Sequence, residues 1–143
     1  MSRGRGGART QVCSKEHARN RLAHARKFLE VAEMTTGEAG DVEYASAAAT
    51  LAVLAGIAAS DAACCAALGR RSRGQDHQQA VKLVEQVEPG GSRAAKSLRR
   101  LLSLKDEAQY GFFDVGGRDL QAAIRHARTL IGFAAGAVRR APA

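Results

Sequence analysis

Aromatic residues are scarce in this sequence: tryptophan is absent, and Phe, Trp and Tyr together make up 4% of its 143 residues. A hydrophobic core must therefore be filled by Ala, Leu, Val and Ile, and recognition through stacked aromatic rings or an aromatic cage is disfavoured. A chain of this length buries about 70% of its unfolded surface in a single core. We therefore expect one folded domain.

Cysteine is also scarce. The chain has three cysteines, Cys13, Cys64 and Cys65, an odd number of which two are adjacent, and none has the spacing of zinc ligands. This pattern favours neither a disulfide framework nor a metal site, so a reduced cytoplasm is the simplest location. The first ten residues, MSRGRGGART, lack the apolar run of a signal peptide.

Composition also suggests where the folded domain begins and ends. The N-terminal residues are rich in Gly and Arg, which predicts a disordered basic segment over residues 1–13. A single helical domain is expected over residues 14–138. The short basic tail that follows, residues 139–143, contains Arg139 and Arg140.

The charge is divided into blocks along the chain. Residues 1–27 carry eight cations and one acid, residues 28–69 carry six acids and no cation, and residues 70–143 carry fourteen cations and seven acids. The net charge is +8, and 17 of the 22 basic residues are arginines, which suit bidentate contacts with phosphate. This balance favours an anionic partner, although solvated helix faces and a GC-rich genome produce a similar bias.

Apolar residues recur at helical spacing in five segments, and no segment is predicted to be a strand. Ser14, Asp41, Asp76 and Ser92 are suitable N-caps, while Gly37, Gly69 and Pro89 are suitable helix terminators. The predicted helices cover residues 14–34, 41–68 and 76–88, then 92 up to a turn at 110–114, and finally 120–138. We therefore predict an all-α fold, an antiparallel up-and-down bundle of about five helices.

The second predicted helix carries a stripe of small residues at heptad spacing. The stripe comprises Ala45, Ala49, Ala52, Gly56, Ala59, Ala63 and Ala66. Small side chains let helix backbones approach closely, so we expect this helix to be central, with the stripe as core or as a dimer seam. A membrane span is disfavoured, because Asp61 would cost about 2.5–3.5 kcal/mol in lipid.

Arg and His occur together at two places where they could act on a phosphodiester. Arg19 precedes His24, and Arg70 and Arg71 precede His77, with a few residues between. Arginine can hold a phosphate while imidazole transfers a proton near neutral pH. No zinc, Ser-His-Asp or phosphate-loop signature accompanies them, and we predict neither a metal nor a cofactor.

Basic residues cluster on three predicted surfaces that could bind nucleic acid. The candidates are Arg19, Arg70, Arg71, Arg73, Arg99 and Arg100. A phosphate placed at the start of the helix that contains His77 would meet free backbone N–H groups, the helix dipole and the guanidinium groups of the preceding loop. The alternative is that His77 is an ordinary polar residue of the first turn.

Two segments resemble HEPN domains, the higher eukaryote and prokaryote nucleotide-binding family. The first is the end of the long helix at Ala67-Leu68-Gly69 with the following GQDHQQAVKLV, and the second is the segment LLSLKDEAQYGFF, residues 101–113. In order and number of helices the resemblance covers residues 15–138. It implies a homodimeric helical bundle. In active members, signature Arg and His residues from two subunits form a metal-independent RNase, often the toxin of a toxin–antitoxin pair.

The sequence departs from the family pattern at the signature residues themselves. Lys105 occupies the position of the signature Arg, Asp106 follows it, and Tyr110 occupies the position of the signature His. Lysine offers a phosphate a point charge, whereas tyrosine, with a pKa near 10, supplies almost no base at neutral pH. The resemblance therefore implies a weak or lost nuclease, with Arg71, His77, Lys105 and Tyr110 as candidate catalytic residues.

Three functions remain open at this point. The leading prediction is a cytoplasmic, HEPN-like homodimer that binds nucleic acid, RNA rather than DNA, without spanning a membrane. The second is a metal-independent endoribonuclease, whose partner would be an antitoxin. The third is a protein-interaction scaffold whose basic charge serves only solubility.

Overall fold

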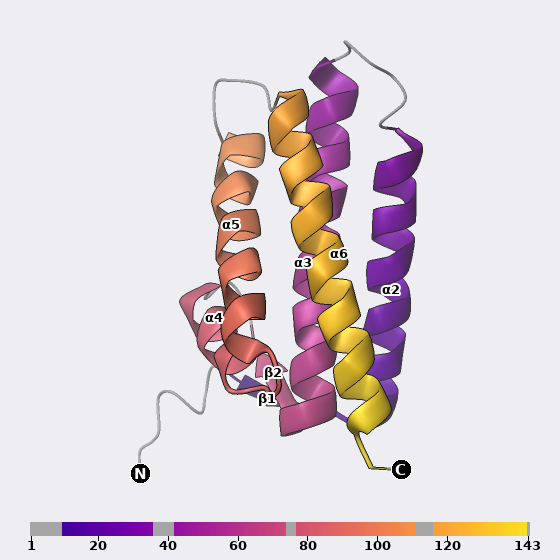
Figure 1. The fold of residues 1–143 in the computed structure, drawn as a ribbon, viewed down its shortest axis with the longest axis vertical. Helices are drawn as coiled ribbons and strands as arrows, with labels where there is room; N and C mark the ends of the chain where they lie inside the picture. Colours follow the sequence, from indigo (N-terminus) through magenta and orange to yellow (C-terminus); the bar gives the residue numbers. More distant parts are fainter. Residues whose placement is uncertain (1–9, 36–41, 74–76, 111–115, 143) are drawn as a thin grey trace.

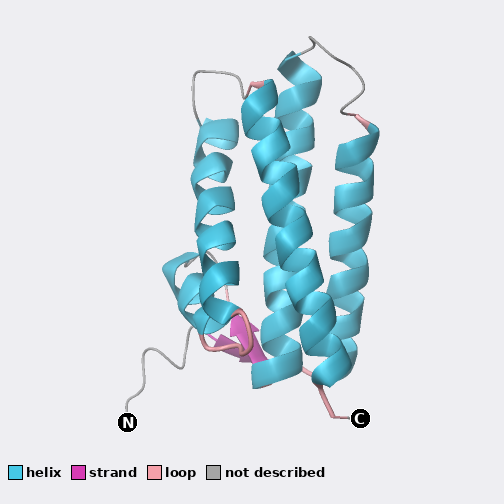
Figure 2. Cartoon of the chain, viewed as in Figure 1, coloured by secondary structure: helices cyan, strands magenta, loops and turns pink. Residues whose placement is uncertain are grey.

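The computed structural model describes residues 10–35, 42–73, 77–110 and 116–142, apart from the side chains of residues 42–43 and 106–110. Within this part of the chain, five helices and one small antiparallel sheet are formed (Figures 1 and 2). The helices are α2 (Lys15–Met34), α3 (Val42–Leu68), α4 (His77–Glu85), α5 (Gly91–Tyr110) and α6 (Gly117–Arg140). The strands are β1 (Thr10–Val12) and β2 (Arg70–Ser72). The predicted all-α helical bundle is confirmed.

Four long helices run side by side in alternating directions, and α4 lies beside α5 at the end of the bundle that also holds the two strands (Figure 1). Helix α3 packs against α2, α5 and α6, and contacts α4 and β2 near its C-terminal end. Its predicted central position is therefore confirmed. Since α4 packs against β2 and against α5, residues from the loop after α3 and from the start of α4 gather at this end.

The small-residue stripe explains why α3 is central. Ala49, Ala52, Ala59 and Ala63 are fully buried, and Gly56 lies against Leu101 of α5 and Leu130 of α6. The stripe thus forms the core of the subunit and is not a free seam for a second copy. By length and composition Tyr44–Leu68 could cross a membrane, and 61% of its apolar window is buried inside the bundle.

Helix α2 begins where its cap was predicted. The Ser14 side chain accepts a hydrogen bond from the backbone N–H of His17 at 3.1 Å, and the His17 ring accepts one from the backbone N–H of Ser14 at 3.0 Å. This reciprocal pair satisfies two donors that the first helical turn leaves unpaired. The bound Nδ1 of His17 is an acceptor, so in the neutral ring the proton lies on Nε2.

The sheet was not predicted. The structure pairs Thr10 with Ser72, Gln11 with Arg71 and Val12 with Arg70, so residues 10–12 of the segment expected to be disordered form a strand. The rest of that segment, residues 1–9, lies outside the described residues. Three-residue strands rich in Arg and Gln have no apolar alternation to reveal them, and only their pairing at the end of the bundle defines them.

The cysteine interpretation was wrong. Cys13 and Cys65 form a disulfide across 52 residues of sequence, which ties the end of β1 to the last turns of α3. Adjacent helical residues point about 100° apart. Cys65 therefore faces Cys13 while Cys64 enters the main core, where burial raises the pKa of its thiol to about 12. This disulfide removes the cysteine argument for a reduced compartment, so a cytoplasmic location stays a prediction without that support.

Candidate nucleic-acid interface

A groove of about 580 Å³ lies between α4 and α5, and we call it the α4–α5 groove. Its lining consists of His77, Gln78, Val81, Lys82, Glu85, Arg99, Leu102 and Ser103. The apolar residues Val81 and Leu102 are buried and form its floor, because both belong to the core faces of their helices. Its polar residues lie on the outer faces of the same two helices. Three of them, His77, Lys82 and Arg99, are basic, and one, Glu85, is acidic.

The structure brings two of the predicted catalytic candidates together at the edge of this groove, which His77 lines and Lys105 does not. Lys105 Nζ of α5 lies 3.4 Å from His77 Nε2 of α4, and both side chains are half-buried. They lie 28 residues apart in the sequence. His77 is a candidate because it follows the basic loop after the long helix, and Lys105 because it occupies the position of the HEPN signature Arg. With its ammonium donating to Nε2, the neutral imidazole carries its proton on Nδ1.

The rim of the groove carries further positive charge. Lys82 is exposed, and the Arg99 guanidinium donates to the Glu85 carboxylate at 2.9 Å. Both side chains of this pair are about half exposed, at 54% and 44%. An exposed ion pair contributes about 1 kcal/mol or less, so Arg99 can exchange Glu85 for a phosphate at little cost. Arg100, the next residue on α5, is exposed to solvent.

The other predicted basic residues lie elsewhere. The Arg71 guanidinium donates to Gln11 at 3.0 Å and to the Ser72 carbonyl at 3.2 Å, and it lines a different cavity from His77. The predicted Arg71–His77 pair is therefore not formed. Arg73 is exposed after β2, and Arg70 is half-buried within it.

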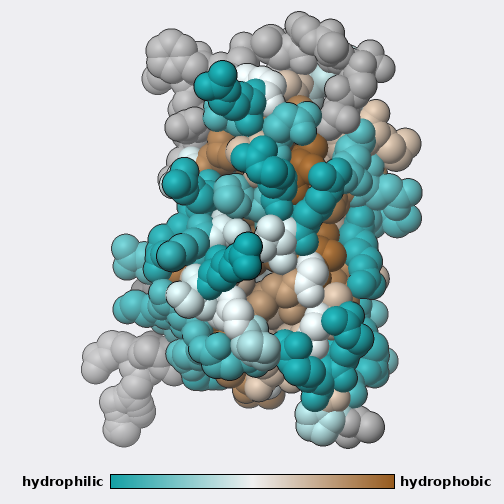
Figure 3. All heavy atoms as spheres, in the orientation of Figure 1, coloured by the Kyte–Doolittle hydropathy of each residue, from teal (hydrophilic) through white to brown (hydrophobic). Residues whose placement is uncertain are grey.

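Two further candidates have no part in the groove. Arg19 is exposed on α2, at a distance in the fold from α4 and α5. The side chain of Tyr110 lies outside the described residues, so its predicted role is neither supported nor opposed. On the face that Figure 3 presents, hydrophilic residues predominate and a band of hydrophobic residues runs beside α6.

A second polar cavity, which the sequence did not reveal, lies beside the disulfide. We call it the Asp61 cleft; it measures about 410 Å³ and is lined by Gln11, Val12, Cys13, His17, Asn20, Arg21, Asp61, Cys65 and Arg71. Asp61 comes from the C-terminal third of α3 and Arg21 from the first half of α2, and their hydrogen bond spans 40 residues of sequence. The one available signal is an acid that follows the uncharged run Tyr44–Ser60, and from the sequence alone it is used only as evidence against a membrane span.

The groove and the cleft are neighbours. A small cavity of about 70 Å³ is lined by Asp61 and Ser72 on one side and by His77 and Leu102 on the other. Asp61 thus belongs to both the cleft and this cavity, while His77 belongs to both the cavity and the groove. The two sites are therefore adjacent, with this small cavity between them.

The charge state of Asp61 is set by two opposed effects. Burial raises the pKa of this carboxyl above its ordinary value of 3.8, while the positive charges of Arg21 and Arg71 oppose the rise. Because the folded-state pKa is the higher one, the folded protein binds this proton more tightly than the unfolded chain does. The contribution of Asp61 to the free energy of unfolding therefore falls as the pH rises from below 3.8 through the folded-state pKa.

We expect Arg21→Met to raise the pKa of Asp61 further, because the substitution removes the nearest opposing charge. The measurement is a carbon-13 NMR titration of the Asp61 carboxyl. Lys27→Met is the matched control, since Lys27 pairs with Glu30 on the exposed face of the same helix. An Asp61 pKa below 3.8 in the unsubstituted protein, or one that Arg21→Met leaves unmoved, contradicts this account.

Comparisons with known proteins do not place the chain in a family. No protein-family model and no curated protein sequence matches it. The HEPN resemblance therefore continues to depend on the two sequence segments described above and on the helical bundle that it implied.

Proposed function

We propose that this protein is a HEPN-like nucleic-acid-binding protein that binds RNA in preference to DNA along the α4–α5 groove. The observation that carries the proposal is the approach of Lys105 Nζ to His77 Nε2, 3.4 Å apart, at the edge of a groove that His77 lines together with Lys82 and Arg99. A net charge of +8 adds long-range attraction for a polyanion.

Phosphate is the ligand that these groups match best. The groove offers an ammonium, a guanidinium and an imidazole as donors, and no stacked aromatic rings among its lining residues. Phosphate contacts of this kind position a strand without reading its sequence. Arg73 is exposed four residues before His77 and could extend the contact with the strand. Arg100 is exposed as well, but its charge acts on His126 of α6, so it lies on the side of α5 that faces α6.

RNA affinity should depend on the groove and on salt. We expect Lys82→Ala combined with Lys105→Ala to weaken binding of a single-stranded RNA about tenfold at low salt. Each phosphate contact that is lost means that fewer counterions leave the RNA when the complex forms, and this release drives binding. The logarithm of the association constant should fall with the logarithm of salt concentration by roughly 0.7 for each phosphate contact. Fluorescence anisotropy measures both quantities.

The matched control for this experiment combines Arg26→Ala with Lys27→Ala, which removes two exposed cations from α2. It should leave RNA affinity almost unchanged. Equal losses in the groove variant and in this control would show that only net charge matters, and affinity that is undetectable at low salt would contradict RNA binding altogether.

RNA cleavage without a metal is the second candidate function, and the His77–Lys105 pair is the observation that favours it. When the Lys105 ammonium turns from Nε2 to the phosphate, the imidazole Nε2 can take the proton of a ribose 2′-hydroxyl while that oxygen attacks the adjacent phosphorus, and the ammonium can stabilise the negative charge that develops. The bond from phosphorus to the 5′-oxygen breaks, this oxygen takes a proton from solvent water, and a 2′,3′-cyclic phosphate remains. Cleavage of tRNA or total RNA in a chelator, abolished by His77→Ala, would establish this activity.

A homodimer, an antitoxin or other protein partner and a cytoplasmic location belong to the same proposal. The small-residue stripe no longer supports the dimer, because it is buried within the subunit. Light-scattering mass and the 260/280 absorbance ratio of the purified protein test self-association and bound nucleic acid together. A stoichiometric protein neighbour without nucleic acid would favour the scaffold alternative.

A further inference from the structure

The Asp61 cleft contains a carboxylate whose hydrogen-bonding capacity is largely unused. Among the described residues, only Arg21 donates a hydrogen bond to Asp61, through one guanidinium nitrogen at 3.5 Å to Oδ2. The Asp61 side chain is nevertheless only 16% exposed. Buried carboxylate oxygens are normally well paired, so an acceptor with this much unused capacity, facing a cavity, indicates a ligand that donates hydrogen bonds.

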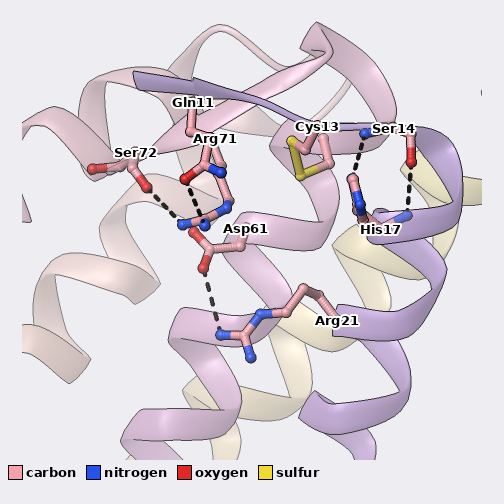
Figure 4. The surroundings of a disulfide bond; sticks show 9 residues. Gln11, Cys13, Ser14, His17, Arg21, Asp61, Arg71 and Ser72 are labelled. Carbon is pink, nitrogen blue, oxygen red and sulfur yellow. Dashed lines mark hydrogen bonds and ion pairs between the residues drawn. A yellow bond between two sulfur atoms is a disulfide. The ribbon is translucent and has the colours of Figure 1, made fainter. Parts of the chain in front are cut away.

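Donors surround this acceptor. In Figure 4 the Asp61 carboxylate lies between the guanidinium groups of Arg21 and Arg71. Arg71 uses two of its nitrogens on Gln11 and the Ser72 carbonyl, and Arg21 uses one on Asp61, which leaves N–H groups of both available. In its neutral form His17 adds an Nε2–H, because its Nδ1 is held by the backbone of Ser14.

A ligand that fills this cleft must therefore present both donors and acceptors. A bare phosphate presents only acceptors and would lie against the Asp61 carboxylate. A nucleobase edge presents both kinds of group, and the cleft volume of about 410 Å³ lies within the range of small-ligand sites, about 300–1,000 Å³. Arg guanidinium planes can also stack on a base where aromatic rings are scarce.

Guanine matches this arrangement better than the other bases. Its N1–H and N2–H groups are adjacent donors that can pair with the two oxygens of one carboxylate, while its O6 and N7 accept from arginine. Adenine, cytosine and uracil lack two adjacent donors of this kind on the Watson–Crick edge.

We propose that the Asp61 cleft binds a guanine base, with Asp61 accepting from N1–H and N2–H and with Arg21 and Arg71 donating to its acceptor atoms. The inference deepens the proposed function, because a strand with a guanine in the cleft would continue past the cavity between Asp61 and His77 into the α4–α5 groove. Asp61 is then a specificity-determining residue, and the cations of the groove supply affinity without sequence preference.

Calorimetric titration with mononucleotides tests the cleft without RNA. We expect GMP to bind at least tenfold more tightly than AMP, CMP or UMP, and inosine monophosphate, which lacks the N2 amino group, to bind several-fold more weakly than GMP. Asp61→Asn keeps the side-chain shape and should weaken GMP binding at least tenfold. Glu30→Gln removes an exposed carboxylate of α2 outside the cleft and is the matched control.

The outcomes separate this inference from the proposed function. If the protein binds RNA in the groove but shows no preference among the four mononucleotides, or binds inorganic phosphate as well as GMP, the guanine site is wrong and RNA binding stands. If GMP binds with the expected preference but RNA does not bind, the guanine site stands and the proposed function is wrong. The inosine comparison uses the unsubstituted protein, so it decides the question even if Asp61→Asn fails to fold.

The source of the guanine is a second question that the same protein can answer. Competition between GMP and RNA oligomers of equal length, one with a central G and one with a central A, separates a base within a strand from a free nucleotide. Preference for the G oligomer that is lost in Asp61→Asn supports recognition within RNA. If the two oligomers bind with equal affinity and only free GMP shows the preference for guanine, the site is restricted to free guanine nucleotides and has no link to the groove.

Discussion

Replacing Cys13 with Ser, or reducing the disulfide, is expected to lower the free energy of unfolding by about 4 kcal/mol. The disulfide joins residues 52 positions apart, and in the chain-entropy model a closed loop of that length restricts the unfolded chain by roughly this amount. For a domain of this size the loss corresponds to a fall in Tm on the order of 10 °C. Thermal unfolding followed by circular dichroism, with and without reductant, measures it.

Cys64→Ser is the control for the disulfide experiment. Cys64 is buried, next to Cys65 in sequence, and takes no part in the disulfide. Its variant should keep the full sensitivity of Tm to reductant, whereas Cys13→Ser and Cys65→Ser should lose that sensitivity. If reductant leaves the Tm of the unsubstituted protein unchanged, the disulfide does not stabilise the fold.

The same disulfide should affect the Asp61 cleft. It holds β1 against the end of α3, and Gln11 of β1 accepts a hydrogen bond from the Arg71 guanidinium at 3.0 Å. Figure 4 shows the disulfide, Gln11, Arg71 and Asp61 at one end of the bundle. Without the covalent tie, β1 would be held by its hydrogen bonds to β2 and by that of Cys13 to the Gly69 carbonyl, so we expect Gln11 to orient Arg71 less firmly.

Gly56→Val is expected to lower the free energy of unfolding by about 3 kcal/mol. A Cβ atom at position 56 would come within 2.2 Å of Leu101 Cδ1 and 3.2 Å of Leu130 Cδ1. Both leucines are fully buried between helices, so neither can turn away into solvent. The added methyl groups must force α3 apart from α5 and α6, and chemical denaturation measures the cost.

Gly132→Val is the matched substitution for this experiment. Gly132 is an exposed residue of α6, and a Cβ atom there would meet nothing within 4 Å. Valine has a slightly better helix propensity than glycine, so this variant should change stability by less than about 0.5 kcal/mol. Similar losses in the two variants would mean that close packing of α3 against α5 and α6 does not decide the effect.

Local pattern was sufficient to predict the helices and the place of α3. The 3.6-residue period and the Ser14 cap follow from neighbouring residues, and the stripe that includes Ala52, Gly56 and Ala59 predicts close approach of whatever packs there. The pattern did not reveal whether that partner is another subunit or other helices of the same chain. The structure shows helices of the same chain, because α2, α5 and α6 together cover the stripe.

For the candidate site, the sequence alone identified residue types but not their pairing. His77 and Lys105 were each selected for their chemistry, and Arg71 was assigned to His77 because they are close in sequence. The structure instead places Lys105 beside His77 and turns Arg71 toward Gln11 in the Asp61 cleft. Proximity along the chain is a poor guide here, because a short strand and the start of a helix direct adjacent side chains to different faces.

What the sequence by itself determined is the set of helices, their buried faces and the basic character of the surface, since each depends on residues a few positions apart. Only the tertiary structure decided the Cys13–Cys65 disulfide, the pairing of β1 with β2 and the meeting of Arg21 with Asp61. These contacts join residues 40 or more positions apart in the sequence. No local periodicity encodes them, because they form only when packing of the long helices brings their ends together.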